Sequence, residues 1–138
     1  MFFSAETWRK VGRFDEGYFL YLEDVDWCLR AADLGVPTWF LGSAVVRHEV
    51  SATVSALPSI VPRYYGYRNY YWLAFRHAPR WALPAIVGDL VWTLVKSALR
   101  WALFPSYRSN SYYHARTRAV LDFLRRRTGP GPYPALAI

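Results

Sequence analysis

The stretch Gly12-Arg13-Phe14-Asp15-Glu16-Gly17-Tyr18-Phe19-Leu20-Tyr21-Leu22-Glu23-Asp24-Val25-Asp26-Trp27-Cys28-Leu29-Arg30 decides the fold of this chain. Its middle, residues 17 to 22, is aromatic and alternates poorly, which predicts an extended segment buried on both sides. A helix is expected from Glu23 to about Leu34, because acids suit a first turn with free backbone N–H groups. Carboxylates cluster densely in this run, and such like charges need solvent, cations or substrate to compensate them. The run therefore has the composition of an active-site rim.

Short elements are predicted on both sides of this run. Ser4 can cap a short helix over residues 5 to 11, and Gly12 suits the position after its end, where φ is positive. Downstream, residues 36 to 41 and 44 to 48 indicate two short strands, because they are rich in β-branched and aromatic residues between turn formers.

The spacing of several residue types resembles family 2 glycosyltransferases. The residues that carry the likeness are Phe14-Asp15-Glu16, Phe19-x-Tyr21-x-Glu23-Asp24-Val25-Asp26-x-Cys28-Leu29-Arg30, Gly35 and His48. The likeness is to the acceptor-side half of the rhamnosyl- and galactofuranosyltransferase-like members, and it is dense over residues 8 to 48. It is looser over residues 62 to 80, where Arg68-Asn69 matches a pair that is common in the family.

This resemblance implies a role for each matching residue. Asp24 would be the general base that takes the proton from the acceptor hydroxyl, with Glu23 beside it in the catalytic pair. His48 would help to hold a divalent metal, Mn²⁺ or Mg²⁺, on the donor diphosphate; without the family pattern, it would be a histidine at a sheet edge. Three further residues are assigned to acceptor binding: Asp15, Glu16 and Trp27.

Other patterns in the same helix have simpler interpretations. Asp26 and Arg30 are four residues apart, so we interpret them as an ordinary helix ion pair. Asp24-Val25-Asp26 has the form of a metal-binding Asp-x-Asp motif, but the family places that motif on an earlier loop.

The resemblance also implies a fold and an activity. The fold is an α/β fragment: part of a GT-A-like acceptor half with a few short strands, followed by a mostly α-helical amphipathic C-terminal region. The activity is an inverting transfer from a nucleotide sugar to a lipid-linked or polysaccharide acceptor. The donor-binding half has no counterpart in these 138 residues. We therefore expect another region or chain to supply the donor site, and an isolated fragment to be inactive. The alternative is a non-catalytic membrane-surface module that keeps the acceptor-side scaffold.

Composition and charge indicate an apolar or anionic partner. The chain is 54% hydrophobic and 19% aromatic, and 17 Lys and Arg against 10 acids give a net charge of +7. A basic, aromatic C-terminal half suits an anionic membrane or a nucleic acid, but the acids of residues 15 to 26 and a long apolar segment count against nucleic acid. The single Cys28 excludes an internal disulfide, and no signal-peptide pattern opens the chain. We expect a cytoplasmic protein, peripheral on the inner face of the cell membrane.

The segment from residue 84 to residue 104 is the most hydrophobic, and as a helix it is long enough to cross a bilayer. Its polar residues Asp89, Thr93, Lys96 and Arg100 recur at helical spacing and would share one water-facing side. A central Lys costs about 2.5–3.5 kcal/mol to insert, and each Leu, Ile or Val returns about 0.3–0.6 kcal/mol. We therefore favour a helix lying in the membrane interface, then a single span, then a buried soluble helix.

The rest of the C-terminal half is predicted to be loop, helix and tail. A helix is expected over residues 63 to 77, and a basic helix over 112 to 127 ends in Arg125-Arg126-Arg127, which either binds anionic lipid or faces solvent. The predicted organisation is an acceptor-side catalytic part (1–50), a loop (51–62), a helical membrane-surface region (63–128) and a disordered tail (129–138).

Overall fold

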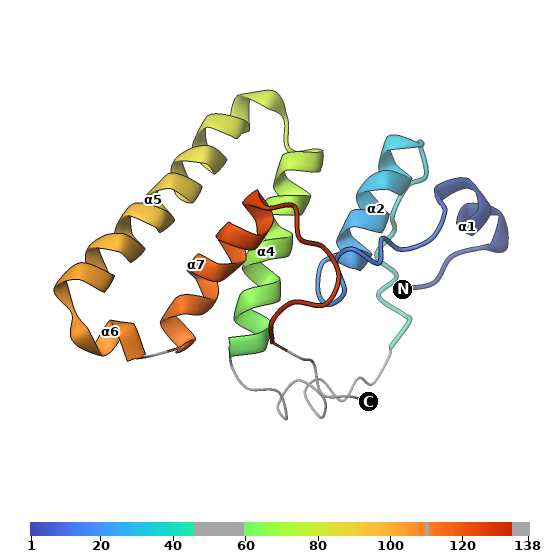
Figure 1. The fold of residues 1–138 in the computed structure, drawn as a ribbon. Helices are drawn as coiled ribbons and strands as arrows, with labels where there is room; N and C mark the ends of the chain where they lie inside the picture. The colour runs from blue at the N-terminus through green and yellow to red at the C-terminus, as the bar shows by residue number, and fades with distance from the viewer. Residues whose placement is uncertain (46–59, 110, 134–138) are drawn as a thin grey trace.

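The computed structural model of the chain describes residues 1–45, 60–109 and 111–133. These residues form helices joined by turns: α1 (Ala5–Val11), α2 (Glu23–Asp33), α4 (Ile60–His77), the single-turn 3₁₀ helix η1 (Arg80–Ala82), α5 (Leu83–Leu103), α6 (Pro105–Ser109) and α7 (Ser111–Leu124). Helices α4, α5 and α7 pack together, α2 lies beside α4, and α1 lies on the far side of α2 (Figure 1).

Helix α1 begins and ends at the predicted capping residues, and α2 begins at the predicted acids. The Ser4 side chain accepts a hydrogen bond from the Thr7 N–H at 3.0 Å, and Gly12 ends α1 with φ 85°. Helix α2 starts at Glu23 with an acidic first turn. The two helices share a small apolar core made of Val11, Trp27 and Ala31, with Trp8 and Phe14 packed against it.

A second core joins α4 to α5 and α7. Small Ala115 and Ala119 on α7 meet the buried Tyr64 and Tyr65 of α4, so the helices approach closely. Next to this contact, a second cluster brings all three helices together through Tyr71, Ile86, Leu90 and Val120. These apolar contacts make the three helices one packed unit.

Helix α5 turns part of its polar side inward. Asp89 accepts hydrogen bonds from Tyr71 of α4 at 2.6 Å and Arg116 of α7 at 2.8 Å, and Thr93 is buried. The prediction of one polar, water-facing side is therefore wrong for Thr93, which is buried. Asp89 keeps 40% of its side chain exposed while it pairs with α4 and α7, and Lys96 and Arg100 are exposed.

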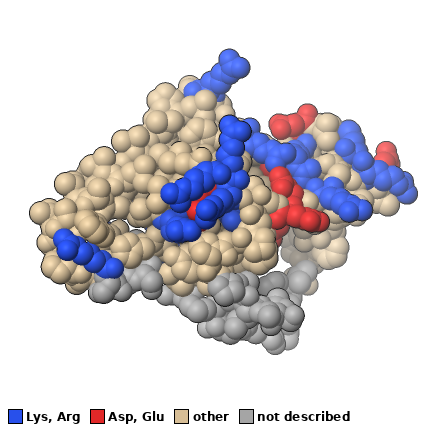
Figure 2. Space-filling model, in the orientation of Figure 1, with Lys and Arg blue, Asp and Glu red and all other residues tan. Residues whose placement is uncertain are grey.

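The opposite side of α5 is apolar and exposed. Val87, Val91, Val95 and Leu99, spaced four residues apart, are each between 44% and 53% exposed. In Figure 2, the surface over α5 is almost free of charged side chains. Among the described helices, the one at Arg80–Leu103 is long and apolar enough to cross a membrane by length and composition.

The predicted α/β fragment with a few short GT-A-like strands is wrong for the described residues, which contain no strand. The expected strand at 36–41 has no partner, and Trp39, Phe40 and Leu41 are largely exposed. Within residues 36–45, the Ala44 N–H donates to the Leu41 carbonyl, and this hydrogen bond closes a turn. A strand needs a neighbour for its backbone groups, and the described residues provide none here.

Two other predictions concern the loop and the tail. The loop expected at 51–62 and the strand at 44–48 lie mostly outside the described residues. Residues 129–133 differ from the disordered tail that their composition predicts, because they contact the body of the protein. The Gly131 N–H donates to the Tyr65 hydroxyl at 2.8 Å, and the Tyr133 ring packs edge-on against Tyr64.

Candidate active site

The segment at residues 17–22 is a compact turn and not the predicted extended run. Phe19, Tyr21 and Leu22 all have positive φ, between 63° and 70°. Such a conformation is rare for residues other than glycine and is found mainly where the surroundings enforce it, often at functional sites. The segment, called here the aromatic loop, ends directly on Glu23 and Asp24 at the start of α2.

Arg68 and Asn69 of α4 hold the aromatic loop by its carbonyl groups. The Arg68 guanidinium donates to the carbonyls of Gly17 and Tyr18 at 3.2 and 2.9 Å. The Asn69 amide donates to three loop carbonyls, those of Tyr18, Leu20 and Tyr21, at 2.7–2.9 Å. Carbonyls that would pair with a neighbouring strand are satisfied here by two side chains, which explains why the loop is not extended.

Arg68 also ties the aromatic loop to the C-terminal segment. Its Nη1 donates to the Gly129 carbonyl at 2.7 Å, and the Gly129 N–H donates to the Gly17 carbonyl at 2.8 Å. The guanidinium is fully buried, with no carboxylate partner in the described residues, and lies 5.0 Å from the centre of the Tyr65 ring. Carbonyl dipoles and aromatic faces therefore stabilise its charge.

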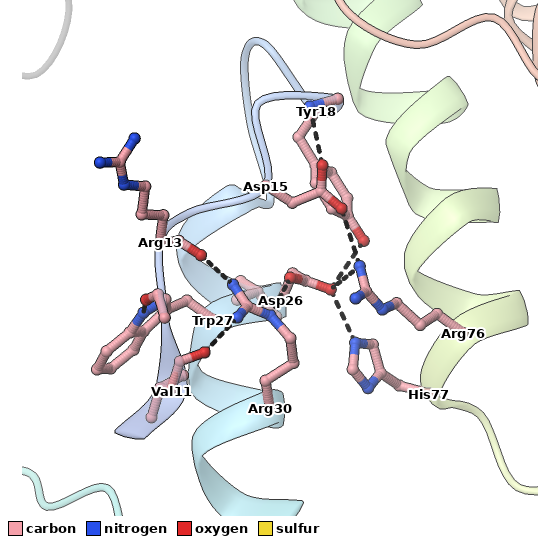
Figure 3. A network of polar contacts seen from close by, with 12 residues as sticks. Val11, Arg13, Asp15, Tyr18, Asp26, Trp27, Arg30, Arg76 and His77 are labelled. Atoms are coloured by element: carbon pink, nitrogen blue, oxygen red, sulfur yellow. Dashed lines mark hydrogen bonds and ion pairs between the residues drawn. The ribbon is translucent and has the colours of Figure 1, made fainter. Parts of the chain in front are cut away.

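Asp26 is the centre of a second network, which joins α2 to α4 (Figure 3). Its fully buried carboxylate accepts from Arg30 Nε at 2.8 Å and from the Tyr18 hydroxyl at 3.2 Å, and it lies 2.9 Å from His77 Nε2. Arg30 in turn donates to the carbonyls of Val11 and Arg13. The predicted Asp26–Arg30 ion pair is confirmed, and it is part of a wider network.

The ionisation of the Asp26 network follows from burial and neighbouring charge. Burial would raise the pKa of Asp26, but hydrogen bonds with His77 and Arg30 and the charge of Arg76 outweigh it, so the pKa falls below its usual 3.8. Burial and the Asp26 carboxylate both raise the pKa of the Tyr18 hydroxyl, so this hydroxyl remains a donor. Asp26 is thus an ionised anchor, satisfied on both oxygens.

The two predicted catalytic acids lie side by side on the first turn of α2. Asp24 is exposed; its Oδ1 accepts from the Val25 N–H at 2.8 Å, and its Oδ2 has no hydrogen-bond partner among the described residues. Glu23 is partly buried, and its buried Oε2 likewise has no partner within the described part of the chain. One anchored oxygen and one open oxygen make Asp24 able to accept a proton from a bound hydroxyl.

The residues predicted to bind acceptor lie in different surroundings. Asp15 is half-exposed; its Oδ1 accepts from the Gly17 N–H and its Oδ2 pairs with Arg76 Nη1 at 2.9 Å. Glu16 is exposed. Trp27 is only 3% exposed, and its indole N–H donates to the Gly12 carbonyl at 2.8 Å, which favours a packing role.

The described residues do not form a metal site by themselves. No group of three or more His, Cys, Asp or Glu side chains gathers within reach of one ion in the parts of the chain that the structure describes. His48, the predicted ligand, lies outside those parts. The described residues therefore do not test the predicted metal, and it stays a prediction.

Sequence reasoning missed how the site is supported. The supporting contacts join segments about fifty residues apart: Asp26 with His77, and Arg68 and Asn69 with the carbonyls of the aromatic loop. The Arg68-Asn69 pair was visible as a motif, but its partners are backbone groups, which carry no sequence signal.

The chain is similar to parts of two rhamnosyltransferases. It is 32% identical over 118 residues to N-acetylglucosaminyl-diphospho-decaprenol L-rhamnosyltransferase of Mycobacterium tuberculosis, covering 86% of this chain and 33% of that protein. It is 27% identical over 140 residues to the dTDP-rhamnosyl transferase RfbF of Shigella flexneri, covering 96% of this chain and 46% of that protein. No protein-family model and no solved structure matches.

The chain spans between a third and a half of the length of these curated relatives. Both relatives are named for sugar transfer. The match to the Shigella protein covers 96% of this chain, so it includes the aromatic loop, α2 and α4. The similarity supports a relationship to glycosyltransferases.

Proposed function

We propose that this chain is the acceptor-side part of an inverting glycosyltransferase with Asp24 as its general base. The observation that carries the proposal is the Asp24 carboxylate, with one oxygen anchored to the Val25 N–H and the other open, at the end of a loop that Arg68 and Asn69 fix. A base held in one orientation loses little freedom when it meets the acceptor hydroxyl.

The proposed reaction is a single displacement. The acceptor hydroxyl oxygen attacks the anomeric carbon of a nucleotide sugar, and the bond from that carbon to the diphosphate breaks with inversion. The hydroxyl proton passes to Asp24 Oδ2. Glu23 remains the proposed partner of Asp24 in the catalytic pair, next to it on the first turn of α2.

We propose a lipid-linked or polysaccharide acceptor, with donor binding by residues outside this chain. The names of the relatives support a sugar acceptor on a lipid diphosphate and a nucleotide-linked rhamnose donor. Asp15 and Glu16 remain proposed acceptor contacts. A divalent metal with His48 as a ligand also remains a proposal, and loss of transfer after chelation would support it.

The experiment is a transfer assay with a panel of nucleotide sugars and two acceptor classes, glycans and polyprenyl-diphosphate sugars. It compares the chain alone, the chain joined to the coding sequence before it, and a mixture with a separately made donor-binding region. The proposal expects a product with inverted anomeric configuration when a donor-binding region is present. Absence of product from every combination would contradict it.

The exposed apolar side of α5 favours a second candidate, a non-catalytic membrane-surface module. Such a module would bind anionic vesicles without transferring sugar. Vesicle binding together with the negative transfer result above would favour this candidate.

A further inference from the structure

A cavity of about 780 Å³ lies between α4, α5, α7 and residues 15–18. Its volume is in the range of small-molecule sites. Its walls are mainly apolar, with Phe75 from α4, Leu90 from α5 and Phe123 from α7. Gly17 and Tyr18 close it on one side, and they belong to the aromatic loop that ends on Glu23 and Asp24.

One part of the cavity wall is cationic. Arg76 and Arg126 line it, and Asp15 is the only carboxylate among the lining residues. Arg76 uses Nη1 for both Asp15 and Asp26, which leaves its other N–H groups without a partner in the described residues. The Arg126 side chain is exposed and makes no polar contact within the described parts of the chain.

Arg126 occupies a backbone position that favours glycine. The Arg127 N–H returns to the Asp122 carbonyl and the Arg126 N–H to the Phe123 carbonyl, which is the Schellman arrangement at the end of α7. Arg126 is its left-handed residue, with φ 54°. A side chain at this position costs stability relative to glycine, and the side chain that stands here places a charge on the cavity wall.

One more feature points to a ligand that is apolar along most of its length. Val87 lines the cavity and also begins the exposed apolar side of α5. A hydrocarbon chain can therefore run from that side of α5 into the cavity without crossing a charged surface.

We propose that this cavity binds the phosphate-proximal end of a polyprenyl-diphosphate-linked acceptor. The diphosphate pairs with Arg126 and the free N–H groups of Arg76, and the first isoprene units lie against Phe75, Leu90 and Phe123. The attached sugar then extends along the aromatic loop toward Asp24. This assignment rests on the proposed glycosyl transfer, and it adds the site at which the lipid end of the acceptor binds.

The test is calorimetric titration of the full chain with farnesyl diphosphate, without donor. Arg126→Gly is the main variant, because glycine suits φ 54° and the fold should keep or gain stability. Arg125→Ala is the matched control, an exposed neighbouring arginine that does not line the cavity. Thermal unfolding of both variants checks the fold.

Arg126→Gly is expected to weaken farnesyl diphosphate binding about tenfold or more, as loss of a charged hydrogen bond does, whereas Arg125→Ala changes it less than twofold. Inorganic diphosphate and farnesol should each bind at least about tenfold more weakly than farnesyl diphosphate. Equal effects of the two variants would overturn the proposal. Equally tight binding of inorganic diphosphate would show a site for phosphate alone and would overturn the assignment. Arg126-dependent binding to phosphatidylglycerol vesicles but not to farnesyl diphosphate would show a bilayer contact and would also overturn it.

The outcome is separable from that of the proposed reaction. Arg126-dependent binding with no sugar transfer would support the lipid site and contradict the proposed glycosyl transfer. Sugar transfer without Arg126-dependent binding would support the proposed reaction and contradict this site.

Discussion

Asn69 is the residue on which the shape of the aromatic loop most depends. Its amide nitrogen donates to three carbonyls while its Oδ1 accepts from Arg68 Nε at 3.0 Å, so the orientation of the amide is fixed from both ends. The loop it holds has three left-handed residues, each of which costs about 1 kcal/mol or more on its own. The position of Glu23 and Asp24 therefore depends on a residue that touches neither of them through its side chain.

Asn69→Leu should destabilise the protein by about 2–4 kcal/mol, because it leaves buried carbonyls without donors. Urea unfolding measures the effect, with Tyr70→Phe as a control on the exposed neighbouring position. The control should change the free energy of unfolding by less than about 0.5 kcal/mol. An Asn69→Leu protein as stable as the control would show that the loop holds its shape without this amide.

Asp26 should make stability depend on acid pH. Its folded pKa lies below the usual 3.8, so its contribution is complete above that value and is lost as the pH falls through the folded pKa. Asp26→Asn should lower stability at neutral pH and flatten the fall in unfolding free energy below about pH 4. Unfolding curves at several pH values test this, beside Glu6→Gln, a control at an exposed acid in the first turn of α1. Parallel pH dependence in wild type and Asp26→Asn would contradict the assignment.

At the scale of the element, local sequence signals gave the helices but not their neighbours. Ser4 and Gly12 fix the ends of α1, and the acidic first turn marks the start of α2, because caps act within a few residues. The apolar segment predicted over 84–104 is α5, at Leu83–Leu103. The strand expected at 36–41 failed because β propensity reports a half-buried pleated surface, and no neighbouring strand provides one in the described residues.

The orientation of α5 could not be predicted from its own residues. Helical spacing places Asp89 and Thr93 on one side, but only the partners on α4 and α7 decide whether that side faces water or protein. Arg116 and Tyr71 draw Asp89 inward, and the side with Val87, Val91 and Val95 is left exposed. We infer that this side of α5 contacts the membrane.

Replacing Val91 and Val95 together by serine should reduce sedimentation with anionic vesicles several-fold, because it removes apolar area from the membrane contact. Thermal stability should stay within a few degrees of wild type, since both positions are about half exposed. Val45→Ser, at an exposed valine away from α5, is the control and should not change vesicle binding. Unchanged sedimentation of the double variant would exclude this side of α5 as the membrane contact.

At the scale of the whole molecule, two apolar cores are joined by polar contacts. The core of α1 and α2 and the core of α4, α5 and α7 are separate clusters. Between them lie the carbonyl contacts of Arg68 and Asn69 and the buried Asp26 network of Figure 3. The proposed catalytic pair, the aromatic loop and the cavity all adjoin this polar junction. The family resemblance identifies the two acids, and the structure shows how α4 holds the loop that precedes them.

The central claim is that Asp24 acts as the base at the end of a fixed loop, and its most direct test is the rate of sugar transfer by Asp24→Asn. The assay uses the chain together with a donor-binding region, and Asp33→Asn, an exposed acid at the other end of α2, is the matched control. Loss of a general base predicts a kcat lower by about 10²–10⁴-fold with little change in the KM for acceptor, while Asp33→Asn stays near wild type. A kcat for Asp24→Asn within about twofold of the control would contradict the claim.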